Sequence, residues 1–347
     1  MQSTLDRKRG PSQMDPTQWV RLGRSPLTVT RLGVGTVPIG GMFAEVSEET
    51  AAATLRRAYE LGVRYFDTAP LYGHGVSERR LGAFLRTRPR QEFVVSTKVG
   101  RLLKEERPDD PQRLSVGFNP FQGAPPLFPT FDFTYDGAMR SVETSLIRLG
   151  LHRIDALLIH DPDDYPDEAM AGAYVALSKL RREGVVGAIG VGMNQAEMLA
   201  RLAREGEFDF FLVAGRYTLL DQAALGELLP ICVERNISVI IGGVYNSGIL
   251  TNPEPGATFN YRPADAPWVA KAQRLKAVCE RHGTPLMAAA IQFPLGHPAI
   301  ATVLTGVRSP AEIEENDRLF RFPIPPELWH DLKAEGLLPE AAPTPSG

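Results

Sequence analysis

Short apolar runs alternate along the chain with longer segments in which apolar residues recur three and four positions apart. Short β-branched runs predict strands, and the longer spacing predicts amphipathic helices. Strands are expected at Leu32–Gly35, Arg64–Asp67, Phe93–Thr97, Ile154–Ile159, Gly187–Val191, Phe210–Val213, Ser238–Ile241 and Thr302–Leu304. Helices are expected at Glu48–Leu61, Ser77–Arg86, Gly137–Leu149, Glu168–Arg182, Gln195–Glu205, Gln222–Arg235, Trp268–His282 and Ala311–Phe320. This alternation is typical of an α/β fold with a parallel sheet.

The number of strands distinguishes between two parallel-sheet folds. Eight strand–helix units fit a closed (β/α)8 TIM barrel in a single domain. A doubly wound sheet that binds a dinucleotide would carry GxGxxG after a strand, and none of the expected strands is followed by that motif. We therefore expect one barrel domain over residues 19–338, with its active site at the carboxyl ends of the strands.

Three segments fall outside the strand–helix pattern. Residues 1–18 are polar and charged and residues 339–347 lack periodicity, so both are expected to be flexible tails. Residues 101–135 form a long connection without clear periodicity, and loops of this length are usually functional or disordered. Its aromatic residues favour an ordered cover over the barrel mouth, with a packed surface excursion as the alternative; they are Phe118, Phe121, Phe128, Phe131 and Phe133.

Composition and charge narrow the class of partner. The 38 basic and 41 acidic residues give a net charge of −3 and are spread along the chain, which argues against nucleic acid or an anionic membrane. Cys232 and Cys279 lack CxxC spacing, so neither a disulfide framework nor a metal site is expected. The sequence shows neither a secretory signal nor an apolar run long enough to span a membrane. We expect a cytoplasmic protein with a small-molecule substrate, and its oligomeric state stays open.

Four polar residues follow three consecutive strands of the predicted barrel. Asp67 and Tyr72 follow the second strand, Lys98 ends the third and His160 ends the fourth. Each alone has a structural interpretation, as a cap, a packed ring, a surface charge or a structural histidine. Because all strands of a barrel end on one face, we expect the four side chains to lie together. Their joint placement favours a catalytic site.

These residue types suit the transfer of a hydride together with a proton. Hydride transfer at a carbonyl carbon requires a positioned group that moves a proton to or from the oxygen. The pKa of a tyrosine is about 10, which is high for proton exchange at neutral pH, and a nearby lysine ammonium lowers it. Asp67 would hold Lys98 in place, and His160 would orient the reacting oxygen. Tyr72 is therefore the predicted general acid–base.

The DTAPLYG segment, the lysine after the third strand and the histidine after the fourth resemble those of the aldo-keto reductase superfamily. The resemblance runs from about Leu22 to Leu338 and implies an NAD(P)-dependent oxidoreductase. Strings such as FDTAPLYGHGVSERRLG and GGVYNSGIL are similar to the subgroup that contains D-threo-aldose 1-dehydrogenase, L-fucose dehydrogenase and pyridoxal 4-dehydrogenase. The resemblance implies oxidation of an aldose such as L-fucose at C1 to the lactone.

Three other functions stay open on the same residues. The first is a pyridoxal 4-dehydrogenase and the second is a general NADPH-dependent carbonyl reductase. The third, from another class, is a nucleotide-sensing subunit that keeps the barrel without useful turnover.

The resemblance also assigns cofactor contacts, with two departures. Asn194, after the fifth strand, would bind the nicotinamide carboxamide, and its alternative role is the N-cap of the next helix. Ala214 stands where many relatives have a glutamine that holds the carboxamide. Gly242 or Gly243 stands where they have a stacking tyrosine, and Tyr245 is a candidate replacement.

The segment LTGVRSPAEIEEN resembles the phosphate-binding and adenine-binding stretch of the family. A carboxylate at Glu312 would repel a 2′-phosphate and can accept a hydrogen bond from a ribose hydroxyl, so NAD is the preferred cofactor. The guanidinium of Arg308 can pair with a phosphate, which keeps NADP open. The contacts expected here are Gly306, Arg308, Glu312, Glu315 and Asn316, the last as the adenine-binding asparagine.

Polar residues beside the predicted site are candidates for binding the substrate. His74 follows Tyr72 by two positions, and a turn cap is its alternative role. The candidate substrate contacts are His74, Asp161, Arg216 and Tyr245.

Overall fold

Eight parallel strands close into a barrel in the computed structural model, which describes residues 13–105 and 121–345. Phe118 lies outside the described residues. The barrel strands, in chain order around the ring, are β3 (Leu32–Gly35), β4 (Tyr65–Asp67), β5 (Val94–Val99), β8 (Ala156–His160), β9 (Ala188–Met193), β10 (Phe210–Ala214), β11 (Ser238–Gly242) and β14 (Ile300–Gly306). All eight strands predicted from the sequence are present, and the predicted (β/α)8 barrel is confirmed.

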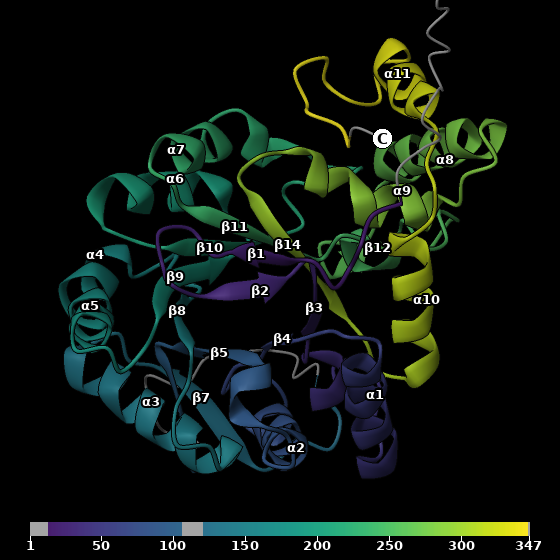
Figure 1. Cartoon of the computed structure of the whole chain (residues 1–347). Helices are drawn as coiled ribbons and strands as arrows, with labels where there is room; N and C mark the ends of the chain where they lie inside the picture. The colour runs from purple at the N-terminus through teal and green to yellow at the C-terminus, as the bar shows by residue number, and fades with distance from the viewer. Residues whose placement is uncertain (1–12, 106–120, 346–347) are drawn as a thin grey trace, which may run out of the picture.

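Helices surround the barrel (Figure 1). They are α1 (Glu48–Glu60), α2 (Val76–Leu85), α3 (Tyr135–Leu149), α4 (Pro166–Glu168), α5 (Tyr174–Arg182), α6 (Ala196–Glu205), α7 (Leu228–Glu234), α8 (Ala266–Arg281), α9 (Leu286–Gln292), α10 (Pro310–Phe320) and α11 (Pro326–Ala334). Short helical turns are η1 (Pro38–Gly40), η2 (Arg90–Glu92), η3 (Ala169–Ala173), η4 (Ala223–Leu225), η5 (Asn246–Gly248) and η6 (Phe293–Gly296). Within the described residues, none of these helices has the length and apolarity needed to cross a membrane.

Two of the predicted helices are interrupted. The helix expected over Glu168–Arg182 contains the π-helical stretch η3, where the N–H of Ala173 donates to Phe133 O at 2.8 Å and thus leaves the regular helical ladder. The helix expected over Gln222–Arg235 is divided into η4 and α7. The helical spacing predicts where helices lie, but tertiary hydrogen bonds decide where they break.

The amino end of the barrel is closed by the hairpin of β1 (Trp19–Arg21) and β2 (Thr28–Thr30). Leu22 and Val29 of this hairpin are fully buried and join the inner core with side chains from the barrel strands, such as Tyr65 and Phe210. Gly23 has a φ of 55°, and a Cβ there would lie 1.9 Å from the carbonyl oxygen of Asp209. The tight turn of the hairpin therefore requires glycine.

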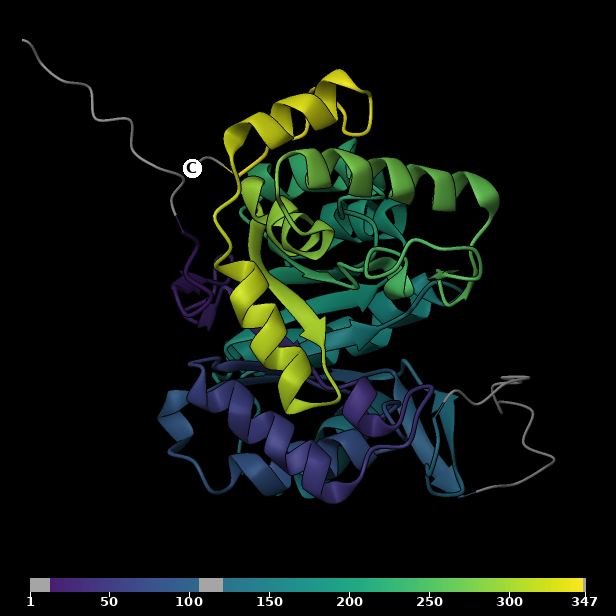
Figure 2. The same ribbon diagram turned by 90° about the vertical axis from the view of Figure 1, so that its right-hand side faces the viewer.

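The long connection after β5 contains a second hairpin, at the opposite end of the barrel (Figure 2). β6 (Arg101–Glu105) and β7 (Leu127–Phe131) pair antiparallel over their whole lengths. Phe121 and Phe133 are buried, the latter against Gly100, whose Cβ would lie 2.3 Å from the ring. The sequence analysis found no periodicity here, because a hairpin of five-residue strands is short compared with the irregular segment around it.

The described parts of both predicted tails pack against the barrel. The N–H of Leu32 donates to Pro16 O at 3.0 Å. At the other end Ala342 is fully buried, and Gly296 lies so close to the backbone of Thr344 that a Cβ would approach it within 2.4 Å. The described residues after Leu338 therefore lie against the barrel, with the backbone near Thr344 packed on Gly296 of η6.

Candidate active site

Asp67 and Lys98 form a buried ion pair at the carboxyl ends of β4 and β5. Lys98 Nζ donates to Asp67 Oδ1 and to the carbonyl oxygen of Thr68, the latter at 2.9 Å. Each of the two charged side chains is at most 2% exposed. Tyr72 lies in the turn after β4, with the centroid of its ring 4.7 Å from Lys98 Nζ. The ammonium therefore stands beside the phenol.

His160, the last residue of β8, completes this group. Its ring meets the ring of Tyr72 edge to face, with 5.7 Å between centroids and 88° between planes. His160 is buried, and its Nδ1 has no hydrogen-bond partner within the described part of the chain. The four side chains predicted from three strand ends are thus adjacent.

Burial governs the charges of these groups. It raises the pKa of Tyr72 to about 12, although the Lys98 charge opposes the rise. Burial lowers the pKa of Lys98, but the charges of Asp67 and Tyr72 outweigh it and the pKa is raised overall. Burial, followed by the charges of Arg101 and Lys98, lowers the pKa of His160 well below its usual value. The expected lowering by Lys98 is present, but desolvation outweighs it in the free protein and the pKa of Tyr72 is raised overall.

A further pair of hydroxyls supports the carboxylate of Asp67. Ser96 Oγ donates to Asp67 Oδ2 at 2.6 Å, and Tyr65 shares a hydrogen bond of 2.9 Å with Ser96. Ser96 is not among the site residues predicted from the sequence. The strand period could have revealed it, since residues two apart on β5 point to the same face and Lys98 follows Ser96 by two.

A cavity of about 570 Å³ adjoins Asp67 and Tyr72 and extends to the start of α10. Its walls include all of the predicted cofactor contacts, namely Asp67, Asn194, Gly306, Arg308, Glu312, Glu315 and Asn316. Ala214 and Gly242 also line it, and a Cβ at Gly242 would find its nearest neighbours 3.5 Å away or more. The small residues at the two departures from the family pattern therefore leave open space.

The start of α10 offers an anion site with its own internal contacts. Ser309 is the N-cap, and its Oγ accepts from the N–H of Glu312 at 3.3 Å. Glu312 Oε2 accepts from the N–H of Arg308 at 2.9 Å, and its other oxygen lies 3.6 Å from Arg308 Nε. Backbone N–H groups at a helix start favour phosphate, and Asn316 adds an amide, so the walls suit a nicotinamide nucleotide.

The structure gives all four candidate substrate residues protein partners, and Asp161 pairs with Arg101 at 2.7 Å. His74 Nδ1 lies 3.4 Å from the carbonyl oxygen of Pro125, and its ring packs on Phe121. Burial lowers the pKa of His74. Tyr245 lines the cavity, and its hydroxyl donates to Asn316 Oδ1 at 2.7 Å. His74 therefore packs against the long connection after β5. The hydroxyl of Tyr245 lies at the side of the cavity that α10 forms.

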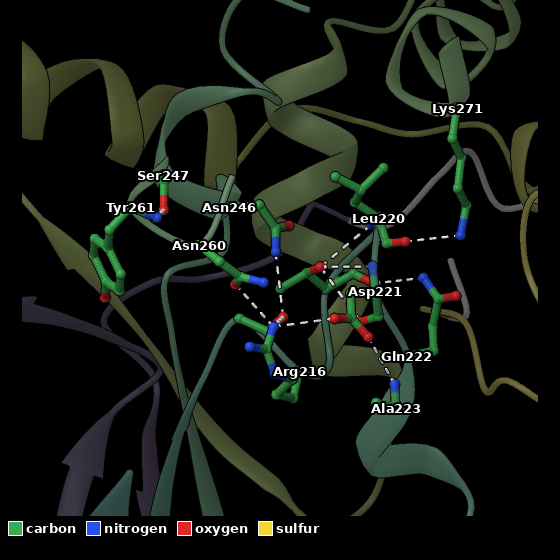
Figure 3. A network of polar contacts seen from close by, with 12 residues as sticks. Arg216, Leu220, Asp221, Gln222, Ala223, Asn246, Ser247, Asn260, Tyr261 and Lys271 are labelled. Carbon is green, nitrogen blue, oxygen red and sulfur yellow. Dashed lines mark hydrogen bonds and ion pairs between the residues drawn. The ribbon is translucent and has the colours of Figure 1, made fainter. Parts of the chain in front are cut away.

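Arg216 belongs to a polar network beside the cavity (Figure 3). Its Nη1 donates to Asn260 Oδ1 at 2.9 Å and to Asp221 Oδ2 at 3.2 Å. Asn246 Nδ2 donates to the carbonyl oxygen of Gly215 at 3.2 Å in the same network. Arg216 thus ties together the segments after β10 and β11, whereas Asp161 directly follows His160 at the site.

This arrangement defines a class of protein, a barrel oxidoreductase with a tyrosine beside a buried lysine–aspartate pair. The family model of the Aldo/keto reductase family matches residues 31–335. The chain belongs to this family, whose members are oxidoreductases that use nicotinamide cofactors.

Two curated relatives match nearly the whole chain. A D-threo-aldose 1-dehydrogenase of a Pseudomonas species is 43% identical over 90% of this chain and 96% of the relative. A pyridoxal 4-dehydrogenase of Microbacterium luteolum is 41% identical over 91% of this chain and 97% of the relative. Among solved structures, an aldo-keto reductase of Bacillus halodurans in its holo form has a TM-score of 0.73 at 24% identity, covering 94% of this chain and 98% of its own. This likeness shows the shared fold.

Proposed function

We propose that this enzyme oxidises an aldose, such as L-fucose or another D-threo-aldose, at C1 to the lactone, with NAD as the preferred cofactor. The observation that carries the proposal is the cluster of Tyr72, Lys98, Asp67 and His160 at a cavity whose far wall suits a nucleotide. The name of the 43% identical relative supports the aldose.

Tyr72 is the proposed general base for the anomeric hydroxyl. The neutral His160 orients that oxygen, and the charge of Lys98 stabilises the phenolate that precedes proton transfer. The bound nicotinamide supplies the acceptor for the hydride that leaves C1. Asp67 keeps Lys98 charged and in position, which Ser96 reinforces. In the reverse direction the same phenol donates its proton.

Glu312 supports NAD over NADP. Its carboxylate lies at the cavity wall and would face a 2′-phosphate with like charge. Arg308 reduces this repulsion, because its charge lies 3.6 Å from the Glu312 carboxylate. Its side chain is about half exposed and could also turn toward a phosphate. We therefore expect a preference rather than an absolute selection.

Pyridoxal is the second candidate substrate. The 41% identical relative carries that activity in its name, and the open space at Ala214 and Gly242 can admit a ring. Reduction of simple carbonyls by NADPH is the third candidate, since it uses the same four residues.

A panel of substrates tests these alternatives. The purified enzyme is incubated with NAD or NADP and L-fucose, D-arabinose or pyridoxal, and with NADPH and simple aldehydes. We expect the highest kcat/KM for an aldose with NAD, with a lactone as product by NMR. A higher kcat/KM for pyridoxal would refute the aldose proposal and support the second candidate. The absence of turnover across the panel would refute the proposal that this protein is an active enzyme.

A further inference from the structure

Arg101 is the first residue of β6, which is not one of the eight barrel strands. Its side chain nevertheless lies beside the active-site residues. Its Nη2 donates to Asp161 Oδ2 at 2.7 Å, and its guanidinium carbon lies 4.8 Å from the centroid of the Phe131 ring. The Arg101 side chain is only 12% exposed. Because Phe131 faces Arg101 across the β6–β7 ladder, the hairpin fixes the position of this positive charge.

One carboxylate oxygen of Asp161 faces two groups. Oδ2 lies 2.7 Å from Arg101 Nη2 and 3.5 Å from His160 Nε2. Asp161 also has a φ of 44°, in the left-handed region that residues other than glycine seldom adopt. A strained turn thus holds this carboxylate between the guanidinium and the imidazole.

The balance of nearby charges determines whether His160 is protonated. Alone, an ionised carboxylate 3.5 Å from an imidazole would favour the imidazolium. Burial lowers the pKa of His160, and the charge of Arg101 lowers it further. Arg101 also donates to the Asp161 oxygen that faces the imidazole, so it partly neutralises the charge that would favour the imidazolium. The charged or titratable groups around His160 are Tyr72 after β4, Lys98 on β5, Arg101 on β6, and Asp161 and Asp163 after β8.

We propose that Arg101 is a positioning residue of the active site, which holds Asp161 so that His160 remains an uncharged imidazole available to the reacting oxygen. This inference rests on the proposed function only for the part that His160 plays in turnover. The charge of His160 is a property of the free protein and can be measured without a substrate.

Two variants should change the titration of His160 in opposite directions. Arg101→Gln removes the positive charge and releases the carboxylate, so the pKa of His160 should rise by about one unit or more, equal to a tenfold change in proton occupancy. Asp161→Asn removes the carboxylate and keeps the guanidinium, so the pKa should fall. Arg101→Lys keeps the charge and should restore a titration close to that of the original protein.

The measurement is an NMR pH titration of the full chain labelled at histidine, with the His160 signal assigned by its loss in His160→Gln. The acid limb of the pH profile of kcat/KM should move to higher pH in Arg101→Gln, while the rate at alkaline pH changes by less than the acid-side rate. A purely structural role would lower the rate at every pH and leave the limb in place.

Arg140→Gln is the matched control. Arg140 forms an exposed ion pair of 2.8 Å with Asp132, close to the same hairpin, and its loss should leave the His160 titration unchanged. An unchanged titration in folded Arg101→Gln, or shifts of the same sign in Arg101→Gln and Asp161→Asn, would overturn the inference. If the titrations shift as expected but the substrate panel shows no turnover, the inference stands and the proposed function fails.

Discussion

At the scale of single residues, burial sets the resting charge of the site before any ligand arrives. The free protein holds a protonated Tyr72 and an uncharged His160 around a charged Lys98. A protonated phenol suits reduction at once, whereas oxidation first needs loss of the proton. On the proposed mechanism, the direction of the reaction therefore depends on pH through Tyr72.

The oxidation rate should depend on pH through Tyr72. Burial raises the pKa of Tyr72 to about 12, so the basic form gains tenfold per pH unit below that value and is nearly absent at neutral pH. We expect kcat/KM for oxidation to increase up to the alkaline limit of stability. Initial rates from pH 6 to 10 measure this, and a profile that is flat above pH 7 would contradict it.

Replacing Tyr72 by Phe should remove turnover and preserve cofactor binding. General acid–base catalysis contributes about 10²–10⁴-fold, so kcat should fall at least that far, while the Kd of the cofactor from fluorescence titration changes little. Tyr59→Phe, on α1 and outside the cavity, is the control and should retain full activity. Near-normal turnover in Tyr72→Phe would refute the assigned role.

The sequence predicted the four central residues, because each one ends or follows a strand and the barrel brings strand ends together. It did not predict Arg101, whose role depends on a hairpin that has no helical or long alternating period. It gave the direction in which Lys98 acts on the Tyr72 pKa but not the net value, since a motif shows which charges are near but not how much water is excluded.

At the scale of elements, the start of α10 is both a capped helix end and part of the wall of the proposed cofactor cavity. Ser309 Oγ accepts from the N–H of Glu312, Glu312 Oε2 accepts from the N–H of Arg308, and the carboxylate of Glu312 also borders the cavity. A bound nucleotide must therefore share or replace contacts that the helix makes by itself.

Glu312→Gln should shift the cofactor preference toward NADP. The change removes a negative charge and keeps an oxygen that can accept hydrogen bonds, so the ratio of Kd for NADP to Kd for NAD should fall about tenfold, or about 1.4 kcal/mol. Glu314→Gln is the control on the same helix, since Glu314 pairs with Arg57 on α1 and does not line the cavity. Equal ratios in both variants would contradict the assignment.

Helix α9 illustrates an element that the sequence could not reveal. Six of its seven residues are buried, so it has no polar face and lacks the apolar period that identifies an amphipathic helix. Helix α10, in contrast, keeps exposed glutamates opposite buried residues such as Ile313 and was predicted within one residue of its start.

At the scale of the whole molecule, each end of the barrel carries one hairpin, and the two hairpins have different roles. The β1–β2 hairpin closes the amino end with apolar side chains, and the β6–β7 hairpin adds a charged residue to the carboxyl end. Stability and chemistry therefore reside on opposite faces, as is usual in this fold.

Gly23→Ala should destabilise the barrel from its amino end. The Cβ would meet the carbonyl oxygen of Asp209 at 1.9 Å in addition to the strain of a positive φ. Gly184→Ala is the matched control, because its φ is 71° but no atom lies within 4 Å of the added Cβ. The control should cost about 1 kcal/mol, and Gly23→Ala should cost more, by urea unfolding. Equal losses would show that the contact relaxes freely.

The β6–β7 hairpin leaves and rejoins the barrel between β5 and α3, and among the described residues its two strands form a sheet separate from the barrel. The hairpin is therefore an insertion that can be exchanged as one segment. A hairpin from a relative, grafted between Gly100 and Asp132, would exchange the residues at the mouth while the frame of eight strands remains untouched. The architecture thereby allows the residues at the barrel mouth, Arg101 among them, to change in one insertion event, without the many coordinated substitutions that altering the barrel itself would demand.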